Sequence, residues 1–165
     1  MNYHNITHCD MLNGDGIRVT LWVAGCPHHC KNCQNPITWD SEGGIPFDSA
    51  AMDEIYDELH NDYCAGITFS GGDPFAPSNR EEVALIASLI KCQFPKKNIW
   101  IYTGYTWEEI INDEVLKRFL TFVDIIVDGP YIEELRDVSL EWRGSSNQRV
   151  ISVQESLKQN KIVTR

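Results

Sequence analysis

The stretch IRVTLWVAGCPHHCKNC, residues 17–33, decides how this chain is expected to fold. Apolar residues occupy every odd position from Ile17 to Val23, and this alternation is typical of a half-buried strand. A glycine and three closely spaced cysteines then break the pattern. We therefore predict a strand over residues 17–24 that leads directly into a loop of unusual chemistry.

The same order of strand, turn and helix recurs along the rest of the chain. Further strands are predicted over residues 67–70, 98–102, 122–127 and 149–153. Helical spacing follows Asp48 or Ser49, follows Asn79, and follows Thr106. The helix after Asn79 is expected to place Val83, Ile86, Leu89 and Ile90 inward. Strands that alternate with helices predict an α/β fold with a mostly parallel sheet and right-handed crossovers.

Two of the predicted helices begin with a polar residue followed three positions later by a glutamate. Asn79 precedes Glu82 in this way, and Thr106 precedes Glu109. Such a pair is typical of a capping box, in which both side chains bond to the first turn of the helix.

Composition limits the classes of function. The chain has 165 residues and a net charge of -10, which argues against general binding to nucleic acid or anionic membranes. No apolar run reaches the roughly 18 residues that span a bilayer. The first residues lack the basic and apolar segments of a signal peptide, so we expect a cytoplasmic protein. Six cysteines in such a protein indicate thiols or metal ligands rather than disulfides.

The turns that follow the predicted strands contain the residues with chemical potential. Ligands of parallel sheets bind outside the carboxyl ends of the strands. Unusual turns stand at four such ends, at residues 25–33, 71–74, 103–105 and 128–130. We expect these turns to meet at one edge of the sheet.

Cys26, Cys30 and Cys33 have the spacing C-x3-C-x2-C, which brings three thiols close enough to hold one soft metal centre. One alternative is zinc, with His28 or His29 as the fourth ligand. Another is a four-iron cluster, in which three cysteines leave one iron open to a substrate or cofactor. The spacing favours the open cluster over zinc and over a set of buried thiols. The other cysteines, Cys9, Cys64 and Cys92, are expected to be small buried residues.

These residues resemble a known family. C-x3-C-x2-C after the first strand is similar to the radical S-adenosylmethionine superfamily, and NGDGIR at residues 13–18 resembles the activating enzymes of glycyl-radical proteins. Four further motifs together resemble the branch that activates anaerobic ribonucleoside-triphosphate reductase: SGGDP (residues 70–74), WIYTGY (residues 100–105), VDGPY (residues 127–131) and WRGSSNQR (residues 142–149).

The resemblance implies a single radical S-adenosylmethionine domain over residues 1–165. Its fold would be a partial, open β/α barrel of about four to six βα units, because a complete barrel needs about 250 residues. The cofactors would be a 4Fe-4S cluster with three cysteine ligands and S-adenosylmethionine. An electron donor such as flavodoxin or ferredoxin would drive cleavage to a 5′-deoxyadenosyl radical. That radical would take a hydrogen atom from a glycine of the reductase, leaving a glycyl radical.

The resemblance also assigns roles to residues. Gly71, Gly72 and Asp73 would contact the methionine end of S-adenosylmethionine, where glycines let the backbone approach closely and an acceptor faces the ammonium group. Asn32 and Gln34, on either side of Cys33, would give backbone contacts to adenine. The superfamily often has an aromatic residue at the position of Asn32, and its absence puts side-chain packing against adenine in doubt.

Two site residues follow later strands. Thr103 would contact ribose or methionine. Asp128 would orient the cofactor, for example by binding a monovalent cation. The alternative role for Asp128 is to cap the next helix. Arg18 is expected on an exposed strand face, with the cofactor or partner surface as the alternative. His28 and His29 are expected to be loop residues rather than cluster ligands. The composition of residues 142–149 predicts a loop, and the resemblance implies that this loop would dock the reductase.

The resemblance does not exclude a radical S-adenosylmethionine enzyme that acts on a small molecule. That enzyme would have the same cluster but no partner with a glycyl radical.

Overall fold

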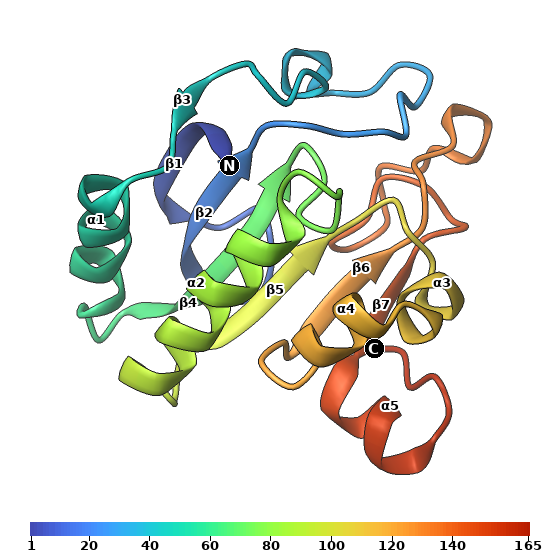
Figure 1. Ribbon diagram of the computed structural model, residues 1–165. Coiled ribbons are helices and arrows are strands. Elements are labelled where there is room, and N and C mark those ends of the chain that lie inside the picture. The colour runs from blue at the N-terminus through green and yellow to red at the C-terminus, as the bar shows by residue number, and fades with distance from the viewer.

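The computed structural model describes residues 1–165, which form one open seven-stranded sheet with helices packed on it (Figure 1). The strands stand in the order β3-β1-β2-β4-β5-β6-β7. Their bounds are β1 (Asn2–Asp10), β2 (Ile17–Val23), β3 (Ile45–Pro46), β4 (Cys64–Gly71), β5 (Asn98–Tyr102), β6 (Ile125–Asp128) and β7 (Arg149–Ser152). The helices are α1 (Ser49–Leu59), α2 (Arg80–Gln93), α3 (Trp107–Asn112), α4 (Glu114–Phe119) and α5 (Val153–Gln159). Short 3-10 turns occur at Pro36–Thr38 and Glu133–Leu135.

The centre of the sheet is parallel, as the alternation of strands and helices predicts. Four strands pair in parallel: β2 with β4, β4 with β5, and β5 with β6. No register shift occurs from the pair Val19 and Ile67 of β2 and β4 to the pair Tyr102 and Val127 of β5 and β6. β1, β3 and β7 join the sheet antiparallel. The fold is therefore mixed α/β with an open sheet whose central strands are parallel.

The sequence pattern did not predict β1. Only Tyr3 and Ile6 among its apolar residues are buried, and a register shift lies between Thr7 and Asp10. Strict alternation is lost at such a bulge, because one strand gains a residue relative to its partner. Antiparallel pairing with β2 stabilises a segment whose own pattern is weak.

Helices α1 to α4 cover one face of the sheet, and the hydrophobic core lies between them and the strands (Figure 1). Val19, Leu21 and Val23 of β2 are fully buried there, which confirms the predicted inward face of that strand. The core contains 27 buried residues and includes none of Cys26, Cys30 and Cys33. The site loops therefore lie outside the main core.

The opposite face carries different residues. Trp100, Ile125, Val127 and Val150 form a small cluster there, with Trp142 packed against it. The expectation that Arg18 lies on an exposed strand face is wrong, because its side chain is fully buried. A strand residue on a helix-free face is covered when a loop crosses it, and Gly14 of the β1–β2 loop lies against Arg18 and Trp100.

The helix starts agree with the sequence in two cases and differ in one. Asp48 caps α1 by accepting from the amide of Ala51 at 3.0 Å, and Thr106 forms the predicted capping box with Glu109. Asn79 directly precedes α2, as predicted, but the predicted capping bond is absent because its side chain makes no bond to the first turn of the helix. It is buried and donates instead to the carbonyls of Asp73 and Gly25.

Three smaller expectations are corrected. Leu89 is 44% exposed, because the buried face of α2 consists of Val83, Ile86, Ala87 and Ile90, and Leu89 lies to one side of that face. Cys64 is buried as expected, but Cys9 and Cys92 are exposed, and all six cysteines are free thiols.

No helix has both the length and the apolar composition that crossing a membrane requires.

Candidate functional site

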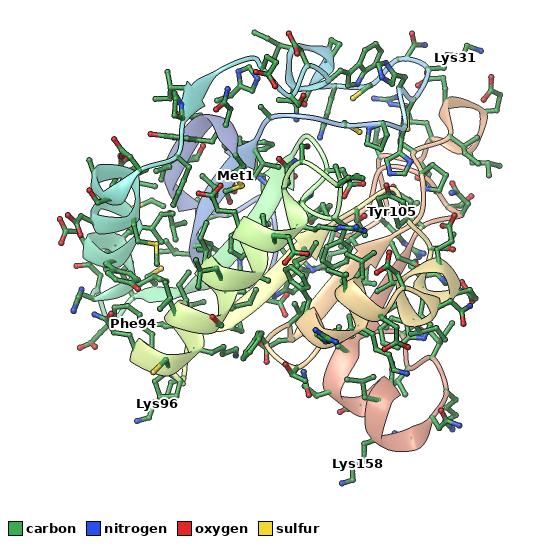
Figure 2. All side chains as sticks on the ribbon, viewed as in Figure 1. Met1, Lys31, Phe94, Lys96, Tyr105 and Lys158 are labelled. Atoms are coloured by element: carbon green, nitrogen blue, oxygen red, sulfur yellow. The ribbon has the colours of Figure 1, made fainter.

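The turns after the parallel strands meet at the carboxyl edge of the sheet. The amide of Gly72 donates to the carbonyl of Val23 at 2.7 Å, and that of Asp73 donates to Gly25 at 2.8 Å. Figure 2 shows Lys31 and Tyr105, which belong to the turns after β2 and β5, at the same end of the molecule. The structure therefore brings the predicted turns together.

The cysteine loop, residues 25–33, leaves β2 at this edge. Its start is held by main-chain bonds from Gly25 to Thr38 at 2.8 Å and from Cys26 to Trp39 at 3.1 Å. Cys26, Cys30 and Cys33 are half-buried free thiols. The amide of Cys33 donates to the carbonyl of Cys30 at 3.1 Å. Three unpaired thiols on one short loop are a donor set that suits a soft metal centre.

Burial favours the protonated form of two of these thiols, Cys26 and Cys30. Burial raises the pKa of Cys26 to about 11, and burial also raises the pKa of Cys30. Metal binding at this loop would therefore release protons. No three metal-ligating side chains are gathered around one point as the ligands of a single ion would be. A four-iron cluster makes a different demand, because each cysteine binds its own iron.

The turn after β4 brings its backbone unusually close to β2. A Cβ atom on Gly72 would lie 2.5 Å from the carbonyl oxygen of Gly25, which leaves no room for a side chain. Gly71 has a φ of +96°, a conformation that side chains disfavour. Both glycines are therefore required by the junction of β2 and β4, independently of any ligand.

Asp73 is buried at the centre of the hydrogen-bond network of the site, with 1% of its surface exposed. Its Oδ1 accepts from the amide of Phe75 at 2.8 Å and from the hydroxyl of Thr103 at 2.9 Å. Its Oδ2 accepts from the amide of Gly104 at 2.9 Å and from Nε2 of His28 at 2.7 Å. The structure thus brings Asp73 and Thr103 together, and their side chains are hydrogen-bonded to each other.

His28 is the residue that sequence reasoning missed. It was expected to be an ordinary loop residue, yet its ring points inward to Asp73 and packs edge-on against Tyr105, with 4.7 Å between centroids. The hydrogen bond to Asp73 raises the pKa of His28. The only available signal was indirect, since His28 and Asp73 follow two strands that pair as neighbours.

Asn32 and Gln34 are exposed on either side of Cys33. Asn32 has a φ of +57°, which asparagine tolerates better than most residues. The backbone conformation at this position therefore favours asparagine in this chain. Neither side chain forms a hydrogen bond with Asp73 or Thr103.

Asp128 lies at the end of β6, is buried, and is already engaged. It accepts from the amide of Trp107 at 2.7 Å, at the first turn of α3, and from Nε of Arg149 at 3.0 Å. Arg149 also donates to Glu108 at 2.8 Å. These carboxylates raise the pKa of Arg149, with Asp128 as the larger cause. Asp128 therefore joins β6, β7 and α3.

The segment between β6 and β7 lies beside the cysteine loop. Lys31 pairs with Glu134 at 2.6 Å, and the main chain of Tyr131 is close enough to Cys30 to oppose the rise of its pKa. Within residues 142–149, Gln148 accepts from the amides of Gly144 and Ser145. This loop is therefore held by its own bonds, and the residues of the segment that lie against the cysteine loop are Tyr131 and Glu134.

Two cavities flank these elements. One of about 260 Å³ lies beside Cys26, between His29, Trp39 and the turn of residues 76–78. Another of about 210 Å³ lies on the helix-free side of the sheet, lined in part by Trp142 and Val150.

Comparison with known proteins agrees with this site. A family model described as a 4Fe-4S single cluster domain matches residues 12–151, which include the cysteine loop, Asp73 and Asp128. Three relatives bear the name anaerobic ribonucleoside-triphosphate reductase-activating protein. That of Enterobacteria phage T4 is 45% identical over 152 residues, or 92% of this chain and 94% of the relative. That of Vibrio cholerae is 41% identical over 150 residues (90% and 96%), and that of Escherichia coli K12 is 40% identical over 152 residues (91% and 97%). The match to an iron–sulfur domain favours a cluster over zinc at the cysteine loop.

Proposed function

The chain belongs to the family of anaerobic ribonucleoside-triphosphate reductase-activating proteins, and from that premise we propose that it generates a glycyl radical on such a reductase. One observation supports this above the others. The Cys26, Cys30 and Cys33 loop lies at the carboxyl edge of a parallel sheet, in direct contact with the Gly71–Asp73 turn through the bond from Asp73 to Gly25. The chain is then an activating enzyme of the radical S-adenosylmethionine type.

In this proposal the three thiolates hold three irons of a 4Fe-4S cluster, and the fourth iron is open to S-adenosylmethionine. When bound, such a cluster would supply one electron from the external reductant, which would break the sulfonium–carbon bond of S-adenosylmethionine to give methionine and a 5′-deoxyadenosyl radical. That radical would take a hydrogen atom from the reductase glycine, giving 5′-deoxyadenosine and the glycyl radical. The protein contributes binding, orientation and exclusion of water.

The turns supply the contacts to S-adenosylmethionine. Gly71 and Gly72 allow close backbone approach at its methionine end. The side chains of Asp73 and Thr103 are bonded to each other, so we assign contacts there to the main chain and assign the carboxylate a holding role. Asn32 and Gln34 give backbone contacts to adenine.

Asp128 remains a cofactor-orienting residue in the proposal. Its position beside the turn after β5 supports this, because the amide of Gly129 donates to Tyr105 at 3.0 Å. The positive charge that a monovalent cation would bring is already supplied by Arg149.

The whole chain serves as one domain in this proposal, with its open sheet as a partial β/α barrel. The helix-free face would admit the glycine loop of the reductase, and the cavity beside Trp142 supports this location. The reductant would be a flavodoxin or ferredoxin. Six free thiols suit the cytoplasm, and the net charge of -10 gives no support for nucleic-acid binding.

Anaerobic reconstitution tests the proposal. We expect about four irons per chain, reductive cleavage of S-adenosylmethionine, and a glycyl-radical signal in electron paramagnetic resonance when the reductase is added. Cys30→Ala should abolish cleavage, whereas Cys92→Ala, at an exposed thiol of α2, should not.

Three results would overturn it. Cleavage that survives Cys30→Ala would exclude the cluster loop as the centre. A colourless protein with one tightly held zinc would support the zinc alternative. Cleavage without a radical on the reductase would indicate an enzyme that acts on a small molecule.

A further inference from the structure

The cysteine loop has few connections to the rest of the fold besides its two ends. Among the side chains of residues 26–33, His28 bonds to Asp73 and Lys31 bonds to Glu134. Lys31 and Glu134 are 70% and 64% exposed, and ion pairs of that kind contribute little. His28 and Asp73 are 19% and 1% exposed, and a charge-assisted bond to a buried carboxylate is much stronger.

The surroundings of His28 are shaped to its ring. A Cβ atom on Gly104 would lie 2.4 Å from the ring, so the turn after β5 accepts this histidine only because it has a glycine there. Tyr105 packs against the ring from the same turn. Asp73 is in turn held by Thr103 and by the amides of Phe75 and Gly104. The partner of His28 is therefore rigid.

We propose that His28 is a positioning residue for the cluster: by donating from Nε2 to Asp73 it holds the middle of the cysteine loop, and with it Cys26 and Cys30, against the ends of β4 and β5. The inference rests on the proposed function, because it assigns this contact to the orientation of cluster ligands. The contact is analogous to the outer hydrogen bonds that orient metal ligands, whose loss typically lowers metal affinity or activity by about 10- to 100-fold.

The test compares three variants of the full chain. His28→Phe keeps a ring against Tyr105 and removes the donor. His28→Gln returns an amide donor near the position of Nε2. Lys31→Gln removes the other side-chain bond of the loop, the exposed pair with Glu134.

Two measurements use reconstituted protein. In His28→Phe we expect the iron chelator ferrozine to extract iron about tenfold faster than from the wild type. We also expect the electron paramagnetic resonance spectrum of the reduced cluster to lose its normal change on addition of S-adenosylmethionine. His28→Gln should restore both properties, and Lys31→Gln should match the wild type.

A third measurement needs no cluster. Hydrogen exchange of the amides of residues 26–34 in metal-free protein should be faster in His28→Phe than in the wild type and in His28→Gln. Gly104→Ala, which displaces the ring, should have the same effect, and the combined Gly104→Ala and His28→Phe variant should be no worse than either change alone.

The proposal is overturned if His28→Phe holds iron and responds to S-adenosylmethionine as the wild type does. It is also overturned if Lys31→Gln is as damaging as His28→Phe, because the bond from His28 to Asp73 would then have no special role in holding the loop. If the wild type takes up no four-iron cluster, the proposed function fails. Unchanged exchange in His28→Phe would then still show that His28 does not hold the loop.

Discussion

Arg18 is fully buried on the helix-free side of the sheet, with no carboxylate within ion-pair distance. Its guanidinium donates to the hydroxyl of Thr68 at 2.7 Å, to the carbonyl of Ile67 at 2.9 Å and to the side chain of Asn98 at 2.7 Å. It also lies 5.3 Å from the centre of the Trp100 ring. Burial lowers the pKa of Arg18 to about 10, so the positive charge persists at neutral pH. Neutral acceptors and an aromatic face together replace the missing counter-ion.

Removing this side chain should be costly. Arg18→Met leaves several buried acceptors without donors, and we expect it to lower the free energy of unfolding by about 3 kcal/mol or more in urea titrations. Arg118→Met, at an exposed position of α4, should change it by no more than about 0.5 kcal/mol. Equal effects of the two substitutions would show that the bonds of Arg18 do not stabilise the fold.

The pKa of His8, in β1, leads to a second prediction for a single residue. Its Nε2 lies 2.7 Å from Glu54 and its Nδ1 lies 3.3 Å from Glu58, and the bond to Glu54 is the main reason that the pKa of His8 is raised. A raised pKa in the folded state means that protonation stabilises the protein. This stabilisation is complete below the pKa of histidine in the unfolded chain, about 6.5, and it is lost as the pH rises through the pKa of His8 in the folded protein.

We therefore expect the wild type to be more stable than His8→Gln at about pH 6, with the difference in Tm shrinking towards pH 8. His28 also has a raised pKa, but it is present in both proteins and cancels in the comparison. A Tm difference that does not depend on pH would contradict the assignment to His8.

At the scale of elements, two helices with similar starting motifs are held in different ways. Thr106 caps α3, and Glu109 bonds back to the amide of Thr106 at 2.7 Å. Asn79 precedes α2 but uses its amide to join the turn after β4 to the end of β2, through the carbonyls of Asp73 and Gly25. The motif predicts the start of a helix in both cases and its capping bond in only one.

Serine substitution distinguishes the two roles, because serine caps helices well but cannot donate two bonds across a turn. Thr106→Ser should be nearly neutral, whereas Thr106→Ala should cost about 1 kcal/mol. Asn79→Ser should destabilise the protein as much as Asn79→Ala, by about 1 to 3 kcal/mol. Urea unfolding of the four variants measures this. Full retention of stability by Asn79→Ser would indicate that Asn79 is only a cap.

At the scale of the whole molecule, stability and chemistry occupy different regions. The large core lies between the sheet and α1 to α4, while the cysteine loop and the segment between β6 and β7 lie at the carboxyl edge and contribute no residue to it (Figure 1). Such edges consist of loops whose local opening costs less than global unfolding.

Removal of the metal centre should therefore leave the fold intact. After chelation under reducing conditions we expect unchanged far-ultraviolet circular dichroism and cooperative unfolding. Faster hydrogen exchange should be confined to the loops at the carboxyl edge. Loss of exchange protection throughout the core strands would show instead that the centre is needed for the fold.

Much of the candidate site could be predicted because its signals are local. The spacing of Cys26, Cys30 and Cys33 places three thiols on one short loop whatever the rest of the chain does. The alternation in β2 and the glycines after β4 are similarly local, since side-chain direction and backbone freedom depend on adjacent residues. β1 could not be predicted in this way, because its order comes from pairing with β2.

The sequence by itself determined the class of the fold, the central strands and the residues that could hold a metal centre. Only the tertiary structure decided what the polar residues do. It showed that Asp73 receives His28 and Thr103, that Asp128 receives Arg149, and that Arg18 is buried. The physical reason is that these contacts join segments far apart in the chain, and a buried polar group takes its partner from whichever segment the sheet order places beside it.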